Sequence, residues 1–221
     1  MAYIRQCLRR ERQIPDRREK AINWSAFEAL MFASWLRVFD CEDPDAEPVA
    51  ELWAEFVRWS LVDGVFDGDA YEATYRQRIP KLDRNERVIW PAQFYVVNLV
   101  RGLLDESTDR RFVSHLLGNP SGMLYVYDEQ ISVRPAEFAS LRTSRWLAAL
   151  EQIAGYASAP ALLARDLRWI AQNQGPDGVW DLGPRSRDGV YFPLSDSWRD
   201  PADRKRDCTA RIRALFARLA R

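Results

Sequence analysis

Apolar residues recur at intervals of three to four positions in several stretches of the chain. This spacing places side chains on one face of an α-helix. Alternation of apolar and polar residues, which is typical of half-buried β-strands, is confined to a short stretch near 123–127. The pattern therefore predicts an all-α protein. The expected helices span 25–38, 48–59, 91–99, 109–118, 140–154, 158–174 and 209–220.

Several helix boundaries are marked by residues that favour helix starts and stops. The sequence Ser25-Ala-Phe-Glu28 fits a capping box, in which the two polar side chains bind backbone N–H groups of the first turn. Pro48 is expected to open the next helix and Gly64 to end it. These first two helices are predicted to form an antiparallel pair.

Three segments at the ends of later helices share one order: helix, glycine turn, aromatic residue, aspartate. They are FVRWSLVDGVFD, FVSHLLGNPSGMLYVYD and LRWIAQNQGPDGVWD, which end at Asp67, Asp128 and Asp181. Their spacing, roughly 60 and then 50 residues, suits two helices and their loops per unit. Because one such unit cannot bury its own apolar face, the repeat predicts stacked helix pairs.

The third segment carries the most specific motif, RDLRWIAQNQGPDGVW over residues 165–180. It is similar to the QW repeat of squalene and oxidosqualene cyclases. Gln174, Gly178 and Trp180 occupy the Q-x3-G-x-W positions, and Arg165 and Trp169 lie on the preceding helix. The chain thus resembles the α/α-toroid superfamily of terpene cyclases and protein prenyltransferases. In that superfamily the motif is structural: the glutamine ties to the next helix and the tryptophan stacks on it.

The resemblance also implies a fold and a domain organisation. We expect a single α/α-toroid-like domain over 1–221, a partial barrel of about three and a half antiparallel helix pairs. A basic segment occupies 1–20, and a long loop rich in aromatic residues and arginines occupies 176–206. A loop of this length inside a compact domain is usually functional or disordered.

Asp207 is the candidate catalytic residue. The resemblance places it where class II terpene cyclases carry the aspartate that protonates an alkene, but Lys205 and Cys208 replace the flanking aspartates of that motif. Nearby cations would hold the Asp207 carboxyl ionised rather than leave it a strong acid. The simpler hypothesis is that Asp207 caps the last helix or pairs with Arg204 or Arg206.

No metal or cofactor is expected. Asp207 and Cys208 resemble part of the zinc site of protein prenyltransferases, but the family spacing differs and the only histidine, His115, lies on another repeat. A zinc site needs more ligands than this pair supplies. His115 is expected to be a packed or hydrogen-bonded residue rather than a base. The acidic stretch 40–45 has the composition of a magnesium motif, but Pro44 favours a solvated connector.

Arginines and aromatic residues share the loop 176–206. Arginines at the mouth of a toroid could hold a diphosphate. Structural ion pairs are the alternative, with partners among the loop aspartates Asp181, Asp188, Asp196, Asp200 and Asp203. The aromatic residues of the loop are Trp180, Tyr191, Phe192 and Trp198, and its arginines are Arg185, Arg187, Arg199, Arg204 and Arg206.

Composition narrows the class of partner. The 221 residues include 32 basic and 32 acidic side chains, for a net charge of +0, so we expect no binding to nucleic acid. The amino terminus lacks the apolar core of a signal peptide, and no apolar run has the length of a membrane span. Together with three scattered cysteines, Cys7, Cys41 and Cys208, this predicts a cytoplasmic protein with reduced thiols. An arginine-rich start, an acidic run over 40–55 and a basic end over 199–221 are expected to be solvated faces.

A partial barrel would leave an apolar concave face that a second copy or a protein partner closes. Trp35, Tyr95, Asn98 and Trp146 are expected on the inner helices, with Trp198, Arg204 and Arg206 at the mouth, as ligand-binding residues. Because every catalytic motif is incomplete, we expect a non-catalytic interaction or scaffold module. The alternative is a small isoprenoid-binding or isoprenoid-transforming enzyme that uses the same face.

Overall fold

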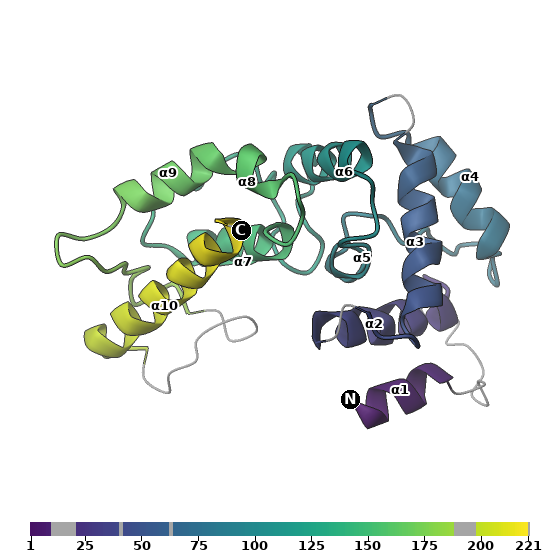
Figure 1. Cartoon of the computed structure of the whole chain (residues 1–221), viewed down its shortest axis with the longest axis horizontal. Coiled ribbons are helices and arrows are strands. Elements are labelled where there is room, and N and C mark those ends of the chain that lie inside the picture. Colours follow the sequence, from purple (N-terminus) through teal and green to yellow (C-terminus); the bar gives the residue numbers. More distant parts are fainter. Residues whose placement is uncertain (10–20, 40–41, 62–63, 188–197, 221) are drawn as a thin grey trace. The chain divides into compact units, whose positions relative to one another are not determined.

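The computed structural model describes residues 1–9, 21–39, 42–61, 64–187 and 198–220 (Figure 1). Within these ranges the regular structure consists of ten helices, with only two isolated β-bridges, between Ile22 and Arg87 and between Met123 and Tyr127. The predicted all-α class is confirmed for this part of the chain. The chain divides into two compact units, Met1–His115 and Leu116–Arg221. The single toroid-like domain over 1–221 stays a prediction.

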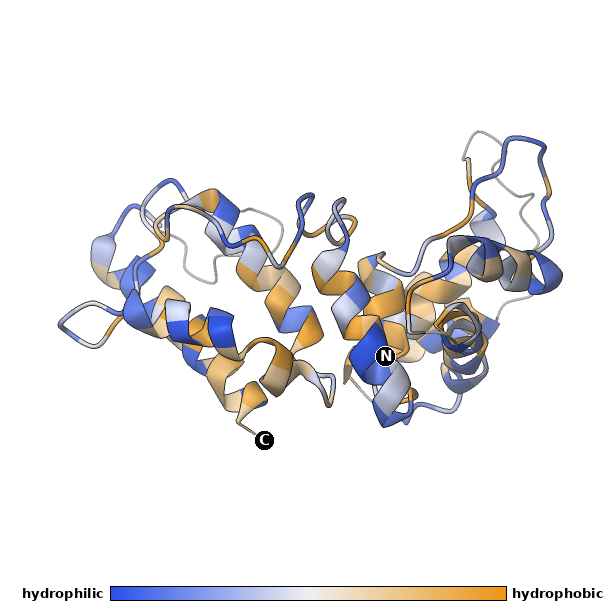
Figure 2. Ribbon diagram, turned by 90° about the horizontal axis from the view of Figure 1, so that it is seen from above, coloured by the Kyte–Doolittle hydropathy of each residue, from blue (hydrophilic) through white to orange (hydrophobic). Residues whose placement is uncertain are grey.

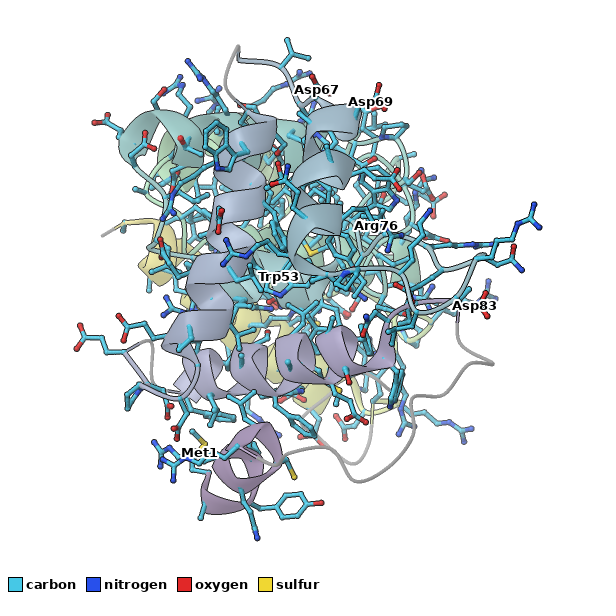
Figure 3. All side chains as sticks on the ribbon, turned by 90° about the vertical axis from the view of Figure 1, so that its right-hand side faces the viewer. Met1, Trp53, Asp67, Asp69, Arg76 and Asp83 are labelled. Atoms are coloured by element: carbon cyan, nitrogen blue, oxygen red, sulfur yellow. The ribbon has the colours of Figure 1, made fainter. Side chains whose placement is uncertain are left out.

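The first unit contains α1 (Ala2–Arg9), α2 (Trp24–Phe39), α3 (Glu47–Ser60), α4 (Gly68–Arg78), α5 (Phe94–Leu99) and most of α6 (Glu106–Gly118). Helices α3 and α4 lie side by side and run in opposite directions, whereas α2 crosses α3 steeply (Figures 1 and 3). The antiparallel partner of α3 is therefore α4, not α2 as predicted. Helix α2 contacts α1, α3 and α5 and occupies the centre of the unit.

Helix α4 is absent from the sequence prediction because its apolar face is so narrow. Only Tyr71 and Tyr75, one turn apart, are buried on it. They pack on Phe56 of α3, with ring centroids 6.2 and 5.5 Å from the Phe56 ring. The Tyr71 hydroxyl donates to the Ile89 carbonyl at 2.9 Å, and Asp67 caps the helix by accepting from two backbone N–H groups. Two aromatic residues and one cap thus form a helix without the usual apolar stripe.

The start of α2 also differs from the prediction. Its first turn is capped by Asn23, whose Oδ1 accepts from the Ala26 N–H at 3.1 Å. Ser25 lies inside the helix instead of capping it. Asparagine caps a helix about as well as serine does, so the sequence offered two caps of similar strength two residues apart.

The second unit contains the end of α6, α7 (Leu141–Ile153), α8 (Ala159–Leu162), α9 (Ala164–Gln172) and α10 (Pro201–Leu219). Helix α7 matches the predicted range, whereas the helix predicted over 158–174 is divided into α8 and α9 at Leu163. Helix α10 begins at Pro201, well before the predicted start. The helices carry both hydrophilic and hydrophobic residues, as amphipathic helices packed on a core do (Figure 2).

The core of the second unit is centred on α7 and α10. Helix α7 buries Trp146, Leu147, Leu150 and Ile153, and α10 buries Ile212, Leu215 and Leu219. A polar contact joins the two helices: the Arg211 guanidinium donates to both carboxylate oxygens of Glu151, at 2.6 and 3.1 Å. The same guanidinium donates to the Ser144 carbonyl at 2.9 Å. These bonds fix the orientation of α10 on α7.

Candidate functional site

The QW-like motif forms a compact turn between α9 and the segment that leads to α10. The Gly175 N–H donates to the Val179 carbonyl at 2.8 Å, and the Gly178 N–H donates to the Gly175 carbonyl at 2.9 Å. Gly178 adopts a φ of 75°, a conformation that costs other residues more than glycine. The Gln174 amide donates to the Gly178 carbonyl at 2.7 Å, so it closes its own turn rather than reaching the next helix. Gln174 is exposed.

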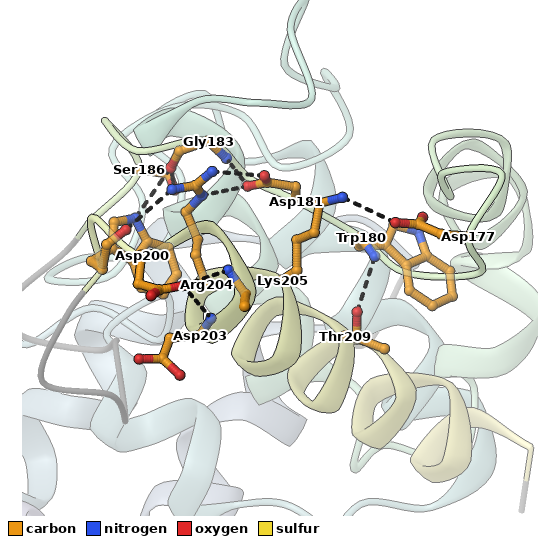
Figure 4. A network of polar contacts seen from close by, with 12 residues as sticks. Asp177, Trp180, Asp181, Gly183, Ser186, Asp200, Asp203, Arg204, Lys205 and Thr209 are labelled. Atoms are coloured by element: carbon orange, nitrogen blue, oxygen red, sulfur yellow. Dashed lines mark hydrogen bonds and ion pairs between the residues drawn. The ribbon is translucent and has the colours of Figure 1, made fainter.

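Trp180 joins the end of α9 to α10. Its indole N–H donates to the Ile170 carbonyl at 2.8 Å, near the C-terminus of α9, where carbonyl groups lack helical partners. Its backbone N–H donates to the Thr209 hydroxyl at 3.0 Å, and its ring lies 6.1 Å from the Phe216 ring, both on α10 (Figure 4). The side chain is only 5% exposed. Trp180 therefore links α9 to α10 through two hydrogen bonds and a ring contact.

A second contact, which we call the α10 clasp, is the ion pair of Asp181 with Arg204. The Arg204 Nε and Nη2 donate to the two carboxylate oxygens at 2.6 and 2.9 Å (Figure 4). This hydrogen bond from the guanidinium is the main reason that the pKa of Asp181 lies below its ordinary value. Arg204 also donates to the Trp198 carbonyl at 3.2 Å, and the Trp198 indole donates to the Gly183 carbonyl at 3.1 Å. Arg204 and Trp198 are both buried.

The clasp agrees with the structural ion pair considered for Arg204, and its binding of a diphosphate stays a prediction. Arg206 is exposed and pairs with Asp203 at 2.7 Å. Arg185 and Arg187 are exposed. The other residues proposed in this loop, Asp188, Tyr191, Phe192 and Asp196, lie outside the described residues.

Asp207, the candidate acid, lies in the second turn of α10 and is 7% exposed. The capping role proposed for it belongs to Asp200, whose Oδ1 accepts from the backbone N–H groups of Ala202 and Asp203 at 2.7 and 3.3 Å. Helix α10 starts at Pro201, directly after Asp200, and proline favours the first helical position, so the capping part of the prediction is wrong. Its neighbour Cys208 is buried, and burial raises the pKa of that thiol to about 11.

The three aspartates of the sequence repeat have different roles in the structure. Asp67 caps α4, Asp128 is exposed in a turn, and Asp181 holds Arg204. Similar residues at regular spacing therefore do not mark equivalent positions in this chain.

The remaining ligand-binding candidates fall into the two units. Trp146 is fully buried, and its indole N–H donates to the Ile131 carbonyl at 2.8 Å, so it belongs to the core of the second unit. Trp169 packs edge-on against it with centroids 5.5 Å apart, while Arg165 is exposed. In the first unit, Asn98 is buried and its amide donates to the Phe94 carbonyl one turn earlier at 3.0 Å.

Two further candidates of the first unit differ in exposure. Tyr95 is half-buried and packs edge-on against Phe27 at 5.7 Å. Trp35 is 42% exposed on α2, where it stacks on Phe39 at 6.4 Å. Of the four residues expected on inner helices, Trp35 is the one that presents a large apolar surface to solvent.

Residues of the arginine-rich start and of the acidic run, both expected to be solvated, form ion pairs in the first unit. Arg5 donates to Asp43 Oδ2 from Nε and Nη2 at 2.9 and 2.6 Å, and Arg9 donates to Asp45 at 2.8 and 2.7 Å. The Asp43 side chain is fully buried, so the expectation of a solvated connector is wrong at that residue. Opposite charge in the two runs was the signal that could have predicted this pairing. Other members of these runs, Arg10, Arg12, Arg17, Arg18, Asp40 and Cys41, lie outside the described residues.

His115, the only histidine, stacks on Phe66 with ring centroids 4.1 Å apart. Burial lowers the pKa of His115 to about 4, so the imidazole is neutral at pH 7. A general base works best with a pKa near the working pH. These properties agree better with the packing role expected for His115 than with a role as a base.

The described residues contain no group of three or more histidine, cysteine, aspartate or glutamate side chains placed to hold a metal ion. In the same part of the chain, none of the helices combines the length and the apolar character needed to span a bilayer.

Comparison of the chain with protein-family models, with curated proteins and with solved structures gives no match. The similarity to the QW repeat therefore stays a prediction from the residues themselves.

Proposed function

We propose that this protein is a non-catalytic interaction module, with helices arranged as in an α/α-toroid, that pairs with a second copy of itself. The observation that carries the proposal is an exposed apolar face on α2, which we call the α2 patch. It consists of Trp35, Val38 and Phe39, which are 42%, 42% and 67% exposed. Their spacing of three and four residues places them on one side of the helix.

Grouped apolar side chains of this size favour an interface. Single exposed apolar residues are common, but a contiguous group gains free energy when a partner removes it from water. Aromatic residues are enriched in interface cores because they bury large areas with little loss of side-chain freedom. A second copy supplies the same surface, and two-fold pairing of identical patches is the commonest form of self-association.

The proposal assigns no catalytic role because the candidate residues make structural contacts. Arg204 holds Asp181, Trp146 forms core, and the pKa of His115 lies far below neutrality. Each of these side chains therefore already has a structural task, which supports an interaction function over isoprenoid chemistry.

The test is the mass of the particle in solution, measured by light scattering after size exclusion at tens of micromolar. We expect the parent to be a dimer and the double variant Trp35→Ser/Phe39→Ser to be a monomer with unchanged helical content. The matched control is Trp59→Ser on α3, because Trp59 is 60% exposed but outside the patch. A monomeric parent, or a double variant that still dimerises, would contradict the proposal.

Native mass spectrometry of the same sample addresses the isoprenoid alternative. A lipid or prenyl diphosphate that copurifies with a monomeric parent would favour an isoprenoid-binding protein. A dimer without added mass would favour the interaction module.

A further inference from the structure

Helix α1 is attached to the first unit in an unusual way. It contacts α2, yet none of its residues is fully buried. Ile4, Cys7 and Leu8 are half-buried, and Tyr3 is 71% exposed. The apolar contribution to its attachment is therefore small, because burial of apolar area is what usually holds a helix on a core.

Charge contacts hold this helix instead. Arg5 and Arg9, one helical turn apart, face Asp43 and Asp45 in the connection between α2 and α3. Each arginine donates two hydrogen bonds to its aspartate, and Arg5 Nε also lies 3.9 Å from Asp45 Oδ2. Figure 3 shows α1, with Met1 labelled, lying against α2 at the edge of the unit.

The two ion pairs are in different environments. Asp43 is fully buried beneath Arg5, and its Oδ1 accepts from the Asp45 backbone N–H at 3.0 Å. Taking a carboxylate out of water costs free energy that the ion pair only partly returns. Arg9 is 67% exposed, and an exposed ion pair stabilises little. The net free energy of docking is thus a small difference between opposing terms.

An isolated helix as short as α1 (8 residues) is not stable in water. Its helical state therefore depends on docking, and the loss of the Arg5–Asp43 pair should release and unfold it together. The Arg9–Asp45 pair is open to screening because Arg9 is exposed, whereas salt acts less on Arg5–Asp43, whose carboxylate is buried.

We propose that α1 is a reversible, charge-controlled cover on α2: it docks through Arg5 and Arg9 on Asp43 and Asp45, and it is released when these pairs are screened or removed. Release exposes the side of α2 that α1 covers and the carboxylate of Asp43. The inference rests on the contacts of α1 alone and does not depend on the α2 patch or on self-association.

The thiol of Cys7 reports this release, because it is half-buried on α1 and free. The measurement is the rate at which a maleimide labels Cys7 in the full chain, with mass spectrometry to locate the label. Cys208, fully buried in the second unit, is the internal reference for a folded protein. Cys41 is replaced by serine in every sample so that Cys7 and Cys208 are the two thiols that can be labelled.

We expect Asp43→Asn to raise the labelling rate of Cys7 at least about fivefold, with Cys208 still protected. In the parent, 1 M salt should raise the rate by a smaller factor, because it screens the exposed Arg9 pair more than the buried Asp43 carboxylate. Arg9→Asp and Asp45→Arg should each accelerate labelling, and the two together should restore the slow rate because the charges are exchanged. The matched control is Arg78→Gln, which removes the exposed pair of Arg78 with Glu55 elsewhere in the unit and should leave Cys7 unchanged.

Thermal unfolding followed by circular dichroism checks that each variant is folded. Two results would overturn the proposal. Labelling that stays slow in salt and in all charge variants would mean that α1 is a permanent part of the core. Labelling of the parent at the rate of an unstructured peptide thiol would mean that α1 does not dock.

Discussion

Helices α1 and α10 are held by the same chemistry but with different support. In each case an arginine forms two hydrogen bonds to a buried or half-buried aspartate: Arg5 to Asp43, with its shorter bond at 2.6 Å, and Arg204 to Asp181, also at 2.6 Å. Helix α1 buries none of its residues completely, whereas α10 buries seven, among them Ile212 and Leu215. The same ion pair thus accompanies a weakly attached helix in one unit and a core helix in the other.

The difference lies in what removes water from each pair. Apolar burial contributes about 25 cal/mol per Å² and is not screened by salt, whereas an ion pair has to recover the cost of desolvating its own charges. On α10 the buried apolar side chains carry most of the attachment, and the pair adds to it. On α1 the pair itself carries the attachment. An arginine–aspartate pair therefore does not indicate by itself how firmly an element is held.

The largest effect is expected where apolar packing holds a helix, at Trp180 between α9 and α10. Trp180→Ala should lower the free energy of unfolding of the second unit by about 3–5 kcal/mol, because a large buried ring is lost together with the hydrogen bond to Ile170. Chemical denaturation followed by circular dichroism measures this. Trp180→Phe keeps most of the packing and should cost only about 1–2 kcal/mol. Equal midpoints for the parent and Trp180→Ala would show that the tryptophan does not join α9 to α10.

The ion pairs themselves give the next effect. Arg204→Gln leaves the Asp181 carboxylate without its guanidinium, and we expect a loss of about 2–3 kcal/mol, since Asp181 keeps some contact with water. Arg5→Gln should lower the free energy of global unfolding by less than about 1 kcal/mol, because α1 can leave while the rest of the unit stays folded.

The double variant Asp181→Asn/Arg204→Gln tests the origin of the stability loss expected for Arg204→Gln. It should be more stable than Arg204→Gln alone, because no unpaired charge is left. If Arg5→Gln and Arg204→Gln destabilise the protein equally, the contrast between α1 and α10 is wrong.

Acid should weaken the first unit through His115. Its pKa is lowered to about 4 by burial, against an ordinary value of 6.5. Above pH 6.5 this residue is neutral in both the folded and the unfolded state, so it does not change the free energy of unfolding. Between pH 6.5 and 4 only the unfolded state takes up the proton, so stability falls as the pH falls, by about 1–2 kcal/mol after allowance for partial exposure.

The control for this pH effect is His115→Gln, which cannot take up the proton. The difference in thermal midpoint between parent and variant should change between pH 7 and pH 4.5. Ion pairs such as Arg5 with Asp43 are present in both proteins, so their pH dependence cancels in this difference. A constant difference across this range would show that the imidazole is not shielded by Phe66.

The sequence predicted the helices with broad apolar faces and missed those without them. Helix α7, with eight buried residues, matched closely, because its apolar spacing is decided by the core. Helix α4 buries only two tyrosines, so hydrophobic periodicity gave little signal for it. In α1 the apolar residues Ile4, Cys7 and Leu8 have helical spacing, but the arginines around them led to the prediction of a basic segment. Both are held by contacts between residues distant in the sequence, which local patterns do not encode.

The candidate site was predicted in part. The motif located Trp180 and its turn, because Gly178 and the tryptophan belong to one local segment. The sequence did not determine the partners of Arg204 and Asp43, since several residues of opposite charge lay within reach of each. In the structure Asp181 meets the buried Arg204 guanidinium with both carboxylate oxygens, and Arg5 lies closer to Asp43 than to Asp45. The cap of α10 was assigned to Asp207 for a different reason, because the start of the helix at Pro201 was not predicted.

The smallest effect is expected at Gln174. By resemblance this residue would tie one helix to the next, and its loss would then remove a buried hydrogen bond. In the structure its amide is exposed and bonds to Gly178 within the same turn. Water can replace that bond, so Gln174→Ala should cost less than about 0.5 kcal/mol. Gly178→Ala is the comparison, because a side chain at its φ of 75° is strained although nothing crowds the position, and it should cost about 1 kcal/mol. Thermal denaturation of the two variants ranks them directly. If Gln174→Ala were the more damaging change, the glutamine would bind beyond its own turn and the contrast between a local turn and a helix tie would fail.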